Sequence, residues 1–206
     1  MADLMDRILL DHPIWNEIIA PNISELKRGE IPPLKTNRPA LAMFALGAAT
    51  FLNIETATRV RLFNFIRKAV VATDAFNLAR THYDRLFSST AVFDEYFLAL
   101  THFENCLAAA HQGHEVLFGI RDAPFFNNNT RRGELNSRMG RMYNSAKHVE
   151  SFVRRSGFTG DVIPVWIIDD GLATSKDKLL FKEIGEILDD MCGAANLIIV
   201  STCPGT

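Results

Sequence analysis

The sequence predicts an all-α fold, an up-down bundle of about five to six helices. Apolar residues recur at intervals of three and four in several long segments, and short connections join these segments. Almost nothing alternates with the two-residue period of a half-buried strand. The 206 residues, 48% hydrophobic and 22% charged, suit a single helical domain over residues 1–206.

The N-terminal part is predicted to form an interrupted helix, an arm and a buried helix. Apolar residues over 2–20 have helical spacing, which Pro13 interrupts. Residues 21–39 hold four of the eight prolines together with Gly29, which predicts a loop or arm on the surface. The apolar run from Ala40 to Leu52 is shorter than the roughly 20 residues of a membrane span, so it predicts a core helix.

Three long amphipathic helices are predicted next. The first extends from about Glu55 to Tyr83, and the second has a regular apolar seam at Phe93, Tyr96, Leu100, Phe103, Leu107, Ala110, His114 and Leu117. The third extends from about Thr130 to Arg155, with its seam at Leu135, Met139, Met142, Ala146, Val149 and Val153.

The C-terminal part combines a short extended segment with a last helix. Residues 162–168 are apolar and β-branched, and Asp169, Asp170 and Gly171 are turn residues. They predict either a short β-hairpin or an extended arm near 162–171, and Pro164 excludes a central strand. The last helix is predicted from about Lys178 to Val200.

Composition indicates a soluble, cytoplasmic protein without a membrane partner. The formal net charge of −2 gives no general basic field, so contact with nucleic acid would need a local patch. Cys106, Cys192 and Cys203 form no CxxC pair, as is typical of a reduced compartment. The N-terminus lacks the basic start and apolar run of a signal peptide.

The sequence predicts neither a metal site nor a cofactor. His102, His111 and His114 lie on one predicted helix, but no Glu-x-x-His pair of a di-iron bundle occurs. His114 falls on the apolar seam, which favours a hydrogen-bonded core histidine. Neither a G-x-G-x-x-G loop nor a Walker-type GKS or GKT sequence is present.

One face of the helix predicted over 130–155 is polar and basic. His148 lies seven positions after Arg141, so both point in the same direction to within about 20°, away from the apolar seam. Asn144 lies between them, and Arg138, Lys147 and Arg155 add positive charge. Histidine can move a proton at a ribose 2′-hydroxyl, and arginine can stabilise charge on a phosphate. The pair therefore suits metal-independent RNA cleavage.

The stretch from Arg141 to His148 resembles the motif of the HEPN superfamily, an arginine followed after four to six residues by a histidine on a late helix. Members are small helical bundles, usually dimeric, and many are ribonucleases of toxin–antitoxin or phage-defence systems. The resemblance implies a homodimer with two motifs at a shared cleft, an RNA substrate and a protein partner such as an antitoxin. Met142 departs from the pattern, since active members commonly carry a polar residue directly after the arginine.

Two hypotheses about function follow. In the first, the protein is a HEPN-like RNA-binding protein or metal-independent endoribonuclease. Arg141 and His148 would be catalytic, and the phosphate would be bound by Asn144, Lys147, Arg138 and Arg155. In the second, the chain is a non-catalytic helical module for protein interaction or dimerisation, and the polar stripe is only the solvated face of its helix.

Overall fold

The computed structural model describes residues 25–50, 54–89, 91–118, 131–147 and 164–202. These form five packed helices and a small three-stranded antiparallel sheet, so the predicted mostly helical bundle is confirmed. The predicted helix over 2–20 and the end of the helix predicted to Arg155 lie outside the described residues. No helix among those described is both long and apolar enough to cross a membrane.

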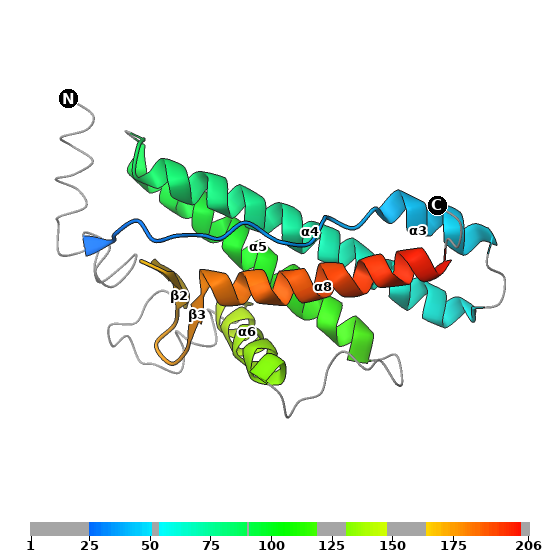
Figure 1. Cartoon of the computed structure of the whole chain (residues 1–206). Helices are drawn as coiled ribbons and strands as arrows, with labels where there is room; N and C mark the ends of the chain where they lie inside the picture. The colour runs from blue at the N-terminus through cyan, green and yellow to red at the C-terminus, as the bar shows by residue number, and fades with distance from the viewer. Residues whose placement is uncertain (1–24, 51–53, 90, 119–130, 148–163, 203–206) are drawn as a thin grey trace.

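A long antiparallel hairpin of two helices forms the centre of the molecule (Figure 1). Helix α4 spans Thr56–Leu86 and α5 spans Val92–Phe118, close to the predicted boundaries. The predicted seam of α5 is confirmed, since Tyr96, Phe103 and Leu107 are almost fully buried. They pack against buried residues of α4, among them Phe76, whose ring meets Phe103 edge to face at 6.3 Å.

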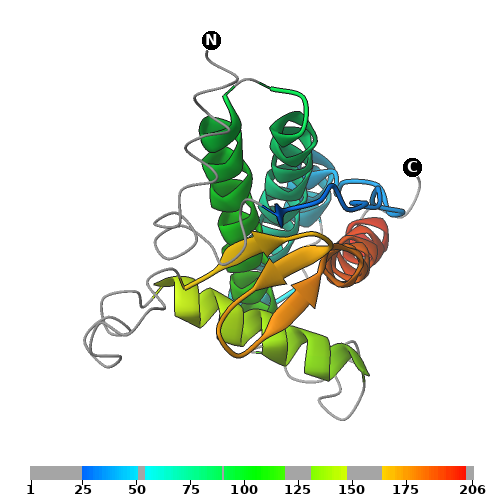
Figure 2. The ribbon, with the colours of Figure 1, turned by 90° about the vertical axis from the view of Figure 1, so that its left-hand side faces the viewer.

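The remaining helices pack around this hairpin. Helix α3 is Leu41–Thr50, as the apolar run predicts, and α8 is Phe181–Thr202. Helix α6 is Arg131–Lys147 and crosses below the sheet in Figure 2. Its predicted seam is confirmed within the described part, because Leu135, Met139 and Met142 are buried. The polar face of α6 therefore points away from the core.

The sheet extends the predicted hairpin by one strand. Strand β1 is Trp166–Ile168, β2 is Gly171–Ala173 and β3 is Lys178–Leu180, in the order β1-β2-β3. The helix predicted from about Lys178 begins instead at Phe181, since residues 178–180 pair with β2. The Asp169–Asp170 turn is confirmed. The glycine after it is required sterically, because a Cβ at Gly171 would lie 2.3 Å from the Leu179 carbonyl oxygen.

The described part of the arm, residues 25–40, runs in an extended path along α4 and α8 (Figure 1). Hydrogen bonds from its backbone N–H groups to side chains of α4 and α8 hold it in place. The Asp189 carboxylate accepts the N–H groups of Lys35 and Thr36 at 2.8 Å each, and the Tyr83 hydroxyl accepts that of Gly29 at 2.8 Å. Residues 25–40 form no α-helix or strand, and these hydrogen bonds make them an integral part of the packing.

Candidate nucleic-acid interface

The structure describes four of the six residues that the sequence singles out for the site. Arg138, Arg141, Asn144 and Lys147 all lie on α6, on its polar side or at the edges of that side. His148 and Arg155 lie outside the described residues, so their predicted roles in proton transfer and phosphate binding stay predictions. Arg141, Asn144 and Lys147 are exposed, whereas Arg138 is partly covered.

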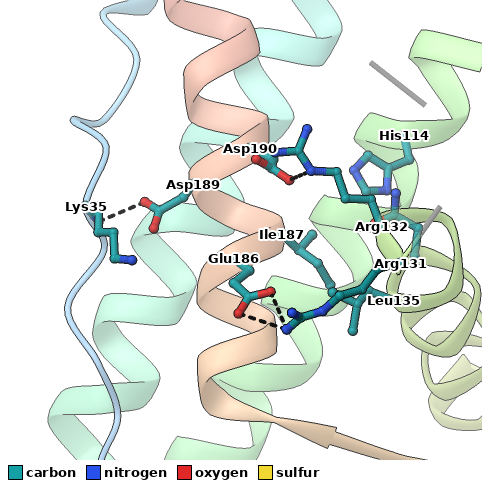
Figure 3. Close-up of a pocket in the computed structure, with 10 residues that line it drawn as sticks. Lys35, His114, Arg131, Arg132, Leu135, Glu186, Ile187, Asp189 and Asp190 are labelled. Carbon is teal, nitrogen blue, oxygen red and sulfur yellow. Dashed lines mark hydrogen bonds and ion pairs between the residues drawn. The ribbon is translucent and has the colours of Figure 1, made fainter. Parts of the chain in front are cut away.

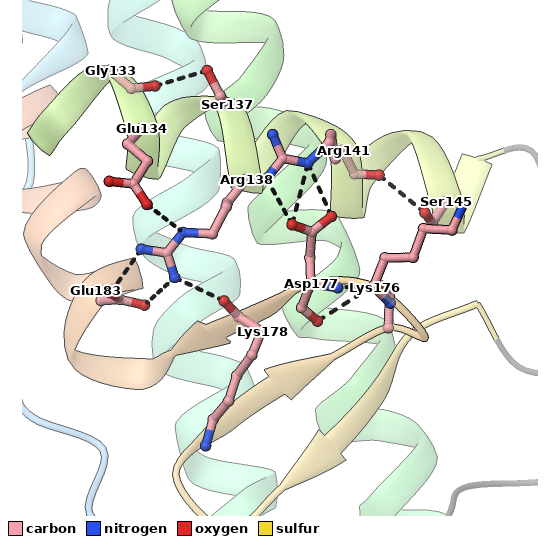
Figure 4. Close-up of polar contacts among 11 residues, drawn as sticks. Gly133, Glu134, Ser137, Arg138, Arg141, Ser145, Lys176, Asp177, Lys178 and Glu183 are labelled. Carbon is pink, nitrogen blue, oxygen red and sulfur yellow. Dashed lines mark hydrogen bonds and ion pairs between the residues drawn. The ribbon is translucent and has the colours of Figure 1, made fainter. Parts of the chain in front are cut away.

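Arg141 is held by a carboxylate from the turn between β2 and β3 (Figure 4). Its Nη2 and Nε atoms donate to the two oxygens of Asp177 at 2.6 and 3.0 Å. These bonds lower the pKa of the Asp177 carboxyl, so the carboxylate is ionised at neutral pH. The Arg141 side chain nevertheless keeps 56% of its surface exposed, against 14% for Asp177. The guanidinium is therefore fixed in direction but open to solvent.

The carboxylate that holds Arg141 is itself rigidly placed. The Thr174 hydroxyl accepts the backbone N–H of Asp177 at 2.9 Å, and the Thr174 N–H donates to the Asp177 carbonyl at 2.8 Å. Such local bonds define a tight turn. From the same turn, the Lys176 side chain extends toward Ser145 on α6 (Figure 4). The edge of α6 beside Arg141 thus carries cations from two elements.

Arg138 has a different environment from Arg141. Its guanidinium donates to both oxygens of Glu183, at 3.0 and 3.3 Å, and to the carbonyl of Lys178 at 2.9 Å (Figure 4). Glu183 also accepts the N–H of Leu180 at the start of α8. Because the side chains of Arg138 and Glu183 are only 23% and 12% exposed, these contacts join α6 to β3 and α8. A phosphate would have to compete with all of them.

The other two arginines of α6 are paired as well. Arg131 contacts Glu186 at 3.1 Å, and Arg132 contacts Asp190 at 2.8 Å, both on α8 (Figure 3). Exposed pairs of this kind contribute only about 0–1 kcal/mol each to stability. Together with Arg138 and Arg141, they match the basic helix to the acidic C-terminal part of the same chain. Much of the positive charge of α6 is therefore paired with carboxylates of the same chain.

The α5 side of α6 carries a polar cluster that the sequence prediction missed. The rings of Tyr143 and His111 lie 4.9 Å apart, and the Lys147 ammonium lies 5.7 Å from the Tyr143 centroid. The Gln112 amide donates to the Tyr143 hydroxyl at 3.4 Å and accepts a hydrogen bond from Lys68 on α4. The sequence did offer one indication of this cluster, namely a tyrosine, Tyr143, on a basic helix. Apart from Lys147, the members of the cluster come from α4 and α5, which the helical wheel of α6 does not contain.

The histidines of α5 occupy three different environments. His114 is buried, as its seam position predicts, and desolvation lowers its pKa to about 4. His102 stacks on His82 with ring centroids 5.3 Å apart, and His82 contacts Glu95 at 2.6 Å. His111 lies beside Tyr143. In the part of the chain that the structure describes, no three His, Cys, Asp or Glu side chains gather as metal ligands.

A cavity of about 480 Å³ opens between α5, α6, α8 and the arm (Figure 3). Buried His114 is one of its lining residues, and Arg131 and Arg132 line it opposite Glu186 and Asp190. Both arginines already have carboxylate partners, so an anion entering here would displace existing ion pairs. The charged residues that line the cavity therefore favour neither an anionic nor a cationic ligand.

The chain matches no known family model, no curated protein and no solved structure in the comparisons made. The resemblance to HEPN proteins therefore rests on the residues from Arg141 to His148 and on the helical architecture.

Proposed function

We propose that the protein binds RNA on the outer face of α6 and cleaves it without a metal ion, as the HEPN resemblance implies. The observation that carries the proposal is the state of Arg141, which is oriented by Asp177 yet 56% exposed. An arginine that is already held in one direction loses little conformational freedom when it binds a phosphate.

The geometry of the Arg141–Asp177 pair leaves room for such a contact. Asp177 occupies Nε and Nη2, and Nη1 donates to no other atom of the described residues. A guanidinium has five N–H donors, so the remaining ones are open to a phosphate oxygen. Asp177 reduces the net charge at the site, and it stabilises one orientation in return.

The proposed reaction is an internal transfer at phosphorus. His148 would accept the proton of the ribose 2′-hydroxyl, and the 2′-oxygen would form a bond to the phosphorus atom. The bond to the 5′-oxygen then breaks, and an acid from the second copy of the motif returns a proton to that oxygen. Arg141 would stabilise the charge that develops on the phosphate, with Asn144 and Lys147 positioning the strand.

The decisive experiment measures cleavage of several RNAs in the presence of a chelator. We expect wild type to cleave, and both His148→Ala and Arg141→Gln to lose at least about a hundredfold in rate, since each removes a transition-state interaction. Arg131→Gln is the matched control, because Arg131 is an exposed, ion-paired arginine at the other end of α6. Equal rates in wild type and His148→Ala, or no cleavage by any form, would exclude the enzyme.

A second function, a non-catalytic helical interaction module, is favoured by one specific observation. All four arginines of α6 contact carboxylates of their own chain. Under this alternative the stripe serves tertiary structure, and the chain acts by binding a second copy or another protein. Sedimentation of the full chain, combined with the cleavage assay, distinguishes the two. The ribonuclease needs a dimer that Arg141→Gln leaves intact, whereas a dimer without cleavage supports the module.

A further inference from the structure

Tyr143 differs from the other two tyrosines of the chain. Tyr83 and Tyr96 are buried, whereas Tyr143 is only half-buried on the α5 side of α6. One neighbour of its ring is His111, which also lies closely against Gly140. A Cβ there would lie 3.2 Å from two atoms of the His111 imidazole. The other is the Lys147 side chain, which is exposed.

The cations near Tyr143 also differ from the arginines of α6. Lys147 contacts the Tyr143 ring, and Lys68 contacts Gln112, which in turn donates to the Tyr143 hydroxyl. Neither lysine pairs with a carboxylate of the described residues. Within the described residues, this side of α6 therefore carries two lysines near Tyr143 that no carboxylate contacts directly, while Glu115 contacts the neighbouring His111 at 3.4 Å.

We infer that Tyr143 is a stacking platform for one base of single-stranded RNA, with Lys147 and Lys68 contacting the adjoining phosphates. The inference rests on the proposed function and extends it to a second contact point. Aromatic rings accept any unpaired base, while bases inside a duplex are not available for stacking. A stacked base is held more strongly than an exposed ammonium over a ring, so the base displaces Lys147 toward the phosphate.

The position of Tyr143 on α6 would allow one RNA strand to contact both Arg141 and Tyr143. Measured around α6 from Arg141, Asn144 lies at about 60°, Lys147 at about 120° and Tyr143 at about 160°, all in the same direction. A strand whose phosphate meets Arg141 would thus cross the helix over Asn144 and reach Tyr143 on the α5 side. Binding at Tyr143 is expected to accept all four bases, because stacking reads no hydrogen-bond pattern.

The test is a binding measurement with a fluorescent 2′-O-methyl RNA oligonucleotide, which lacks the 2′-hydroxyl and is not cleaved by the proposed reaction. With the full chain, we expect Tyr143→Leu to weaken binding about tenfold and Tyr143→Phe to leave it nearly unchanged. We also expect Lys147→Gln to weaken binding and to reduce its salt dependence by about one phosphate contact. Lys182→Gln, an exposed lysine on α8, is the control and should bind like wild type.

The outcomes separate this inference from the proposed function. Thermal unfolding of each variant first shows that Tyr143→Leu is folded. Equal affinity of Tyr143→Leu and wild type, or no binding by wild type, overturns the stacking platform whatever the cleavage assay shows. Binding that depends on the ring in a protein that cleaves no RNA would retain the platform and exclude the enzyme.

Discussion

At the scale of single residues, burial decides the chemistry of the histidines. His114 lies on the seam of α5 at 3% exposure, and its low pKa keeps the imidazole neutral at physiological pH. A buried neutral imidazole is a poor general acid or base for a surface-bound strand. His148 remains the histidine that the motif assigns to proton transfer.

His114 should make the stability of the protein depend on pH. Its pKa is about 4 in the folded chain and about 6.5 when unfolded, so the unfolded chain binds the extra proton between these values. The free energy of unfolding should therefore rise with pH from about 4 to 6.5, by up to about 3 kcal/mol from this residue. His114→Leu should flatten that rise in urea titrations at several pH values. Identical slopes in both proteins would contradict the assignment.

At the scale of elements, α6 is attached to the rest of the molecule by two kinds of contact. Its apolar seam packs inward, and its arginines contact the Lys178 carbonyl of β3 and the carboxylates of α8 and of the β2–β3 turn. The half-buried contact of Arg138 with Glu183 differs from the exposed contact of Arg131 with Glu186, because water solvates the second pair well.

These two pairs should have unequal effects on stability. Arg138→Ala leaves the Glu183 carboxylate and the Lys178 carbonyl without their partner, which should cost about 2 kcal/mol. Arg131→Ala is the matched variant on the same helix and should cost less than about 1 kcal/mol. Urea denaturation of both variants measures the difference. Similar losses would show that the exposure of the two pairs is not the deciding factor.

At the scale of the whole molecule, Tyr83 joins three parts that are distant in sequence. Its hydroxyl accepts the N–H of Gly29 from the arm at 2.8 Å and donates to the carbonyl of Asp169 in the β1–β2 turn at 2.9 Å. Its ring packs edge to face on Phe181 at the start of α8, with centroids 5.1 Å apart. One side chain of α4 therefore positions the arm and the sheet against the bundle.

Removing the Tyr83 hydroxyl should weaken the attachment of the arm and the sheet to α4 without creating a cavity in the core. Tyr83→Phe keeps the ring but leaves the Gly29 N–H and the Asp169 carbonyl without that partner, at a cost of about 1–3 kcal/mol. Hydrogen exchange should also become faster in the arm, while the α4–α5 hairpin stays protected. Tyr143→Phe is the control, since its hydroxyl has only a 3.4 Å contact. Unchanged exchange at Gly29 in Tyr83→Phe would contradict this role.

Periodicity along the chain was sufficient to predict the helices and their buried faces. The seams of α5 and α6 depend on residues three and four apart, and this spacing is a local property of an α-helix. The turn at Asp169 and Asp170 was predictable from its residue types, which is also a local property. Strand β3 was not, because Lys178–Leu180 is too short for a pattern and pairs only once β2 lies beside it.

The candidate site on α6 shows the same division between local pattern and tertiary packing. Helical spacing along the chain placed Arg141 on the polar face of a basic helix, away from the apolar seam. The packing of the helices determines that Asp177 holds Arg141, that Glu183 holds Arg138, and that the Tyr143 ring meets His111 of α5. The reason is physical: helical spacing acts over a few residues, whereas the choice of partner between distant charges depends on how the helices pack.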